Sequence, residues 1–109
     1  MKAYYIKQGD AYELPLAITA NGEPADDETL ASVEVMIGPA LRKTWPGEIS
    51  WDGEAECWNV PLTQAETFAM PAGSELGFDV RVKTVSGVVM GILEPVRVRV
   101  VPAASGEEL

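Results

Sequence analysis

Few side chains in this sequence could carry out chemistry. The 109 residues include no histidine and a single cysteine, Cys57. Histidine is the commonest general base and metal ligand at neutral pH, and structural zinc sites need several cysteine or histidine ligands. Cys57 lies between Glu56 and Trp58, with no cationic neighbour in the sequence to favour a reactive thiolate. We therefore interpret Cys57 as an unreactive strand residue and expect no zinc site.

Carboxylates are the remaining candidates, and they cluster at residues 26–28 (Asp-Asp-Glu) and 52–56 (Asp-Gly-Glu-Ala-Glu). Either cluster could bind calcium or supply an acid and base pair, but neither has the twelve-residue pattern of a calcium loop. The sequence also lacks a phosphate-binding glycine loop, a dinucleotide motif and Gly-x-Ser-x-Gly. We interpret both clusters as solvated loops, with a weak cation site at residues 52–54 as the alternative. The sequence thus predicts no enzyme, catalytic residue, cofactor, metal site or small-molecule substrate.

Three tryptophans could instead form a platform on which a sugar ring stacks. Trp58 is in phase with Val60 and Leu62 along a strand pattern, so it is expected to face a core, and Trp45 is expected to do the same. Trp51 precedes an Asp-Gly turn and is the candidate for an exposed, ligand-stacking ring. A carbohydrate-binding module is therefore the alternative function.

The net charge of the chain disfavours two classes of binding partner. A net charge of −9 repels nucleic acid and anionic lipid, so neither is expected as a partner. Residues 1–10 contain no apolar stretch like that of a secretory signal, and no apolar run is long enough to span a bilayer. We expect a protein made in the cytoplasm that does not enter a membrane.

Alternation of apolar and polar residues is the dominant pattern that would position these side chains. It is clearest at residues 78–83 and 96–100 and continues at residues 33–37 and 12–18. Such period-two patterns are typical of half-buried antiparallel strands. Weaker strand patterns occupy residues 3–8, 41–45, 48–51, 57–62 and 87–92.

Turn residues separate these strands at short intervals, which is typical of a sandwich or barrel. We predict an all-β protein, an immunoglobulin-like antiparallel β-sandwich of about 7–9 strands, forming one domain over residues 1–101 with a flexible tail at 102–109. Pro15 and Pro61 cannot donate to a ladder, so their strands are expected at a sheet edge or at a bulge.

Two segments depart from the strand pattern. Thr63 and Glu66 have the spacing of a helix capping box, which predicts a short helical turn near residues 63–69. Residues 23–29 are acidic and are expected to form a mobile loop.

The basic residues indicate a candidate protein-binding face. Arg81, Lys83, Arg97 and Arg99 alternate with apolar residues on two strands that an immunoglobulin-like order places side by side. Their charge could dock an acidic partner or a second copy of the chain, with Glu34 and Asp79 neutralising part of it; an ordinary solvated face is the alternative. Tyr4 and Ile6 belong to a first strand whose edge could extend a neighbour's sheet.

Several of these segments resemble the small immunoglobulin-like structural proteins of tailed bacteriophages and prophages. The similarity is to the N-terminal domain of baseplate upper proteins and runs from about Tyr5 to Val100. It is carried by residues 8–10 (Gln-Gly-Asp), 14–18 (Leu-Pro-Leu-Ala-Ile), 21–24 (Asn-Gly-Glu-Pro), 33–38 (Val-Glu-Val-Met-Ile-Gly), 62–63 (Leu-Thr) and 79–82 (Asp-Val-Arg-Val).

The resemblance implies a non-enzymatic adaptor that binds other virion proteins in the tail, baseplate or head. It implies a location in the virion, or in the bacterial cytoplasm during assembly, and a second copy of the chain is a further candidate partner. This sequence lacks the continuation that the baseplate proteins have after the sandwich, which favours an accessory role over carrying a fibre. Within the same setting, the carbohydrate-binding alternative would serve adsorption to a host surface.

Overall fold

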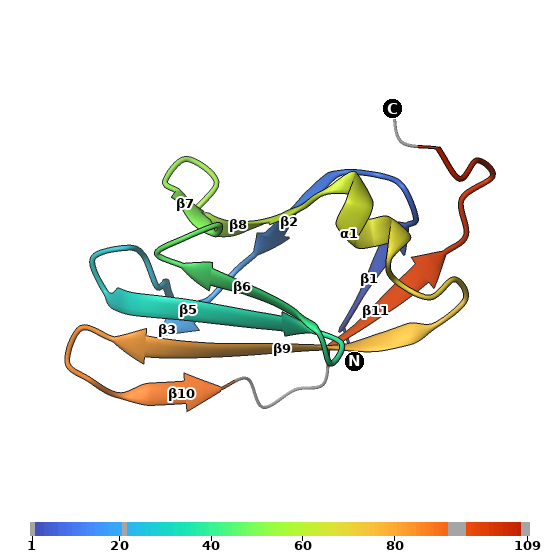
Figure 1. The fold of residues 1–109 in the computed structure, drawn as a ribbon. Coiled ribbons are helices and arrows are strands. Elements are labelled where there is room, and N and C mark those ends of the chain that lie inside the picture. Colours follow the sequence, from blue (N-terminus) through green and yellow to red (C-terminus); the bar gives the residue numbers. More distant parts are fainter. Residues whose placement is uncertain (1, 21, 92–95, 108–109) are drawn as a thin grey trace.

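Two β-sheets pack face to face in this chain (Figure 1). The computed structural model describes residues 2–20, 22–91 and 96–107. The larger sheet contains β1 (Lys2–Lys7), β5 (Leu30–Ile37), β6 (Leu41–Trp45), β9 (Glu75–Thr84), β10 (Val89–Gly91) and β11 (Val96–Val101). The smaller sheet contains β2 (Tyr12–Leu16), β7 (Ser50–Asp52) and β8 (Cys57–Leu62), and a short hairpin joins β3 (Thr19–Ala20) to β4 (Glu23–Pro24).

The strand order is that of an immunoglobulin-like sandwich. The larger sheet runs β1-β11-β9-β5-β6 and the smaller β2-β8-β7, which correspond to the two sheets of a variable-type domain. The predicted all-β sandwich is therefore confirmed. Eleven strands lie within the described residues, more than the 7–9 expected, because the sequence pattern did not separate the two-residue strands β3 and β4. One pairing also differs from the antiparallel expectation, since β1 pairs with β11 in parallel.

The clearest alternating segments became the central strands. Residues 33–37 lie in β5, 78–83 in β9 and 96–100 in β11, as predicted. The less regular segments shifted: β2 ends at residue 16 instead of 18, and the strand expected at 48–51 lies at 50–52. The last residue of the strand expected at 87–92 lies outside the described residues.

The two strand prolines occupy different positions. Pro15 lies on β2, an edge strand of the smaller sheet, as predicted. Pro61 lies on β8, which is the central strand of that sheet, so the prediction of an edge was wrong for this residue. It is tolerated because β7 pairs only with residues 57–59 of β8, so Pro61 lies beyond the end of that ladder.

The core lies between the sheets and is built from the inward residues of the alternating strands. Trp58 is fully buried at its centre, and its indole Nε1 donates a hydrogen bond of 2.9 Å to the carbonyl oxygen of Ala25. Ala25 is itself buried, and its N–H donates to the carbonyl oxygen of Ile18. The acidic segment 23–29 is thus tied to the core at one point, where the sequence predicted only a loop.

The predicted helical turn is α1 (Gln64–Phe68), between β8 and β9. Its capping box is complete: Thr63 Oγ1 accepts from the Glu66 N–H, and Glu66 Oε1 accepts from the Thr63 N–H at 2.9 Å. The turn between β1 and β2 packs on α1, where Gly9 has a φ of +84° and faces the ring of Phe68. A Cβ at residue 9 would lie 2.5 Å from that ring, so the turn requires glycine.

Candidate protein-docking face

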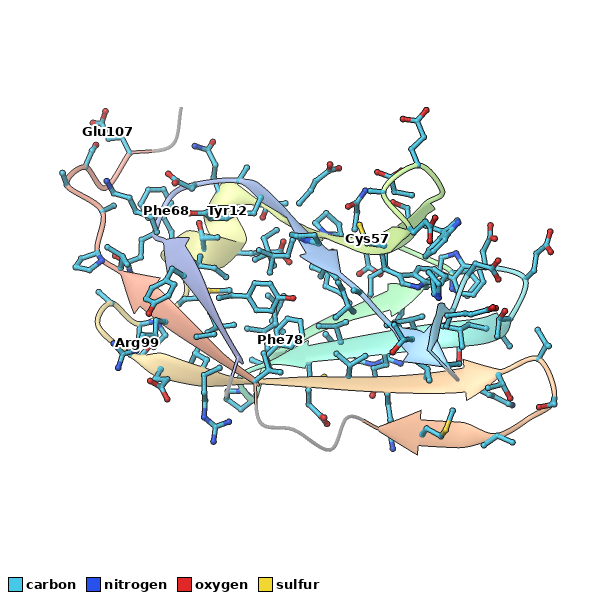
Figure 2. The ribbon with its side chains drawn as sticks, turned by 180° about the vertical axis from the view of Figure 1, so that it is seen from behind. Tyr12, Cys57, Phe68, Phe78, Arg99 and Glu107 are labelled. Atoms are coloured by element: carbon cyan, nitrogen blue, oxygen red, sulfur yellow. The ribbon has the colours of Figure 1, made fainter. Side chains whose placement is uncertain are left out.

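The outer face of the larger sheet carries most of the chain's positive charge. Successive side chains on a strand point to opposite faces, so the residues next to each buried core residue point outward. Arg99, for example, projects away from the sandwich in Figure 2. Six of the eight Lys and Arg residues lie on this face: Lys7, Arg42, Arg81, Lys83, Arg97 and Arg99. All four basic residues predicted for docking are among them.

The arginines on this face form two ion-pair groups, each centred on one glutamate. Glu34 on β5 lies between two arginines, 2.8 Å from Arg42 Nε and 3.1 Å from Arg81 Nη2. Hydrogen bonds from Arg42 and Arg81 lower the pKa of the Glu34 carboxyl. Glu34 thus neutralises part of the positive charge, as the sequence suggested.

The second group lies at the other end of the sheet. Glu75 lies 3.6 Å from Arg97 Nε and 3.1 Å from Arg99 Nε. Asp79, the other acid expected to pair, makes no ion pair within the described part of the chain. Exposed pairs of this kind contribute little to folding stability, so the arginines keep the freedom to exchange partners.

The four predicted basic residues do not form one continuous cluster. Strand β11 pairs only with residues 75–78 of β9, so Arg97 lies opposite Gly77. The other half of β9 pairs with β10, which places Arg81 opposite Gly91 and Lys83 opposite Val89. Strands β9 and β11 lie side by side, as predicted, but the basic residues on them form two groups on one face.

A shallow depression of about 420 Å³ marks the first of these groups. Arg42 and Arg81 line it together with their shared partner Glu34, and Lys83 lies beside them. Lys83 makes no ion pair among the described residues. The depression could seat an acidic side chain between an arginine and a lysine.

The opposite side of the sandwich is acidic. Glu13 points outward from β2, and the turn between β7 and β8 exposes Glu54 and Glu56. Positive and negative side chains therefore concentrate on opposite faces of the sandwich, with the positive ones on the larger sheet.

The first strand lies at an edge of the larger sheet, as predicted, but the side chains of Tyr4 and Ile6 on it point inward. Ile6 is fully buried in the core, so its side chain cannot contact a partner. Tyr4 is partly buried, its ring lies 5.0 Å from that of Phe78, and its hydroxyl donates to the Pro15 carbonyl oxygen. The N–H of Lys7 donates to the hydroxyl of Tyr12, so links to β2 occupy part of the β1 edge.

Trp51 is not an open platform. Its side chain is partly buried, and its ring centroid lies 5.2 Å from that of Trp58. The ring centroid of Trp45 lies 4.9 Å from that of Trp58. Trp58 is core, as predicted, and Trp45 packs against the core. Only part of the Trp51 ring is therefore free to stack on a sugar.

The acidic clusters are used in turns. Asp26 Oδ1 accepts hydrogen bonds from the main-chain N–H groups of Glu28 and Thr29, and Asp52 Oδ1 accepts from those of Glu54 and Ala55. Within residues 2–20, 22–91 and 96–107, no group of three or more acidic or cysteine side chains is arranged to hold a metal ion. No helix in that same part of the chain is long and apolar enough to cross a membrane.

Sequence reasoning missed one buried ionic contact. Lys43 points inward from β6 and its Nζ lies 2.8 Å from Glu66 Oε2, which links the larger sheet to α1. Alternation already places Lys43 in phase with Leu41 and Trp45, and that signal was available in the sequence. This contact holds the fold and lies away from the outer face.

Comparisons of the chain with protein-family models, with curated proteins and with solved structures found no match. A function must therefore be inferred from the charged outer face and from the residues themselves.

Proposed function

We propose that this chain is a non-enzymatic structural or adaptor protein that docks on another protein through the outer face of its larger sheet. The observation that supports this most is the gathering of six basic side chains on one face of a chain with a net charge of −9. Charge complementarity of this kind steers association and fixes the register of partners. The partner surface is acidic.

The phage setting comes from the resemblance to immunoglobulin-like phage proteins. We propose that the partners are other virion proteins of a phage or prophage, in the tail, baseplate or head, and that the chain acts in the virion or in the host cytoplasm during assembly. The absence of histidine supports a role without catalysis.

The experiment measures binding to each structural protein encoded by the genes beside its own. Arg81→Glu with Lys83→Glu tests one basic group, and Arg97→Glu with Arg99→Glu tests the other. Glu13→Lys with Glu54→Lys is the control, because it reverses two charges on the opposite side. Loss of binding in either basic variant, with binding retained in the control, supports the proposal. Equal binding by all three variants refutes it.

A further inference from the structure

The hairpin formed by β9 and β10 concentrates the exposed apolar side chains of the molecule. Six large hydrophobic residues of the described chain are exposed, and four of them lie between residues 85 and 90: Val85, Val88, Val89 and Met90. Isolated exposed apolar residues are ordinary, but a contiguous group indicates a contact surface. Figure 1 shows β10 at the margin of the larger sheet.

Strand β10 also presents unpaired main-chain groups. Among the described residues it pairs with β9 alone, and the carbonyl oxygen of Val88 accepts from the N–H of Thr84. Alternation along an antiparallel ladder then turns the N–H and C=O of Val89 and Gly91 away from β9. An added strand could bond to these groups.

Unlike the other edges, this one is not protected by charge. The remaining edge strands of the two main sheets carry Lys7 on β1, Glu13 on β2, Arg42 on β6 and Asp52 on β7. Charged residues on edge strands prevent pairing with other chains. Residues 84–91 contain no ionisable side chain at all.

We propose that two copies of this chain pair through β10, antiparallel about a twofold axis, so that the two larger sheets join. Because β10 itself carries no charge, two copies that meet there bring no like charges of this strand into direct contact. A charged partner peptide would find no opposite charge on the strand, whereas a second β10 offers matching main-chain groups and apolar side chains. An antiparallel edge is self-complementary under twofold symmetry.

An apolar groove beside β10 favours the same arrangement. It has a volume of about 320 Å³ and lies between β2 and β10, where Leu16, Val82 and Met90 contribute to its lining. Val88 and Met90 lie on the inner face of the sheet but stay exposed, at 51% and 47%. The partner's β10 would continue the sheet and bring its own Val88 and Met90 to the open side of this groove.

The first test is solution mass by light scattering across a concentration series, at low and high salt. The wild-type chain should reach twice the monomer mass and keep it at high salt, because the contact is uncharged. Val89→Lys should weaken the dimer by roughly tenfold, since it places an ammonium group of each copy at the shared edge, where the two like charges repel. Val101→Lys is the matched control, an exposed valine on the outer face of β11, and should leave the dimer unchanged.

Cross-linking provides a second readout if Val89→Lys does not fold. In a Cys57→Ser background, Val89→Cys or Met90→Cys should form an intermolecular disulfide. If the free main-chain groups of Val89 pair with Val89 of the second copy, residue 89 faces its own copy, and if they pair with Gly91, residue 90 does. Val101→Cys should not. A wild-type monomer at every concentration overturns the proposal, and so does a dimer that neither cysteine can cross-link. Docking through the basic outer face would instead be weakened by salt. The salt dependence therefore distinguishes failure of the proposed function from failure of the β10 dimer.

Discussion

Glu66 and Lys43 form the one buried ionic link between α1 and the larger sheet in the described chain. We expect removal of Glu66 to lower the free energy of unfolding more than removal of Lys43. The Lys43 side chain is 8% exposed, whereas that of Glu66 is 24% exposed. Glu66→Gln leaves an ammonium group buried without a counter-charge. Lys43→Met leaves a carboxylate that water can reach and that still accepts from the Thr63 N–H.

The magnitudes follow from that difference. Breaking a buried ion pair by removing one partner costs about 3–5 kcal/mol when the other charge stays buried, and we expect about 3 kcal/mol for Glu66→Gln. Lys43→Met loses a charge-assisted hydrogen bond but also removes the cost of burying the ammonium, so about 1 kcal/mol is expected. Glutamine is a normal capping-box residue, so the Glu66→Gln change leaves the helix cap in place.

Urea unfolding at neutral pH measures both. With a slope of about 1.5 kcal/mol per molar urea, the midpoint should fall by about 2 M for Glu66→Gln and by less than about 1 M for Lys43→Met. A Lys43→Met variant that loses as much stability as Glu66→Gln, or more, would refute the reasoning from burial.

The same pair predicts a pH dependence. Burial raises the pKa of the Glu66 carboxyl, but hydrogen bonds from Lys43 and from Thr63 outweigh it, and the net pKa is lowered from the ordinary value of 4.5. The contribution of Glu66 to stability is therefore present above pH 4.5 and is lost as the pH falls through the lowered value. Lys43→Met removes a main cause of the lowering, so its unfolding free energy should fall less on acidification.

Two further predictions concern the tryptophans. Trp58→Phe removes a fully buried indole and leaves the Ala25 carbonyl without its donor, and it should cost about 2–3 kcal/mol in urea unfolding; a loss below 1 kcal/mol would mean that the indole is not central to the core. Titration with a panel of cell-wall glycans should leave tryptophan fluorescence unchanged, because Trp51 is partly buried against Trp58; a saturable change that Trp51→Ala abolishes would instead support the carbohydrate-binding alternative.

Much of the fold could be predicted because its signals are local. The alternation at residues 78–83 and 96–100 is a property of single strands, and Thr63 and Glu66 satisfy each other within one helical turn. The central position of β8 could not be predicted from Pro61, because the end of the β7 ladder depends on pairing between distant segments. Lys43 was missed because lysine is rarely buried without a partner, and its partner lies 23 residues away.

The candidate site could be predicted only in part, because its arrangement also depends on pairing between distant strands. Alternation correctly placed Arg81, Lys83, Arg97 and Arg99 on one face, since it depends only on each strand. Their division into two groups depends on how β10 and β11 share the edge of β9, which is a matter of register between strands. The burial of Ile6 likewise follows from the smaller sheet packing over β1, which no local pattern in residues 3–8 specifies.

The most direct test of the central claim is the affinity of the chain for the structural proteins encoded beside it, measured by calorimetry at low and high salt. We predict binding to at least one acidic partner, weakened by high salt and reduced roughly tenfold or more by Arg81→Glu with Lys83→Glu or by Arg97→Glu with Arg99→Glu. The Glu13→Lys with Glu54→Lys control should bind as the wild type does. Failure to bind any of these proteins, or binding that neither basic variant weakens, would contradict docking through the outer face.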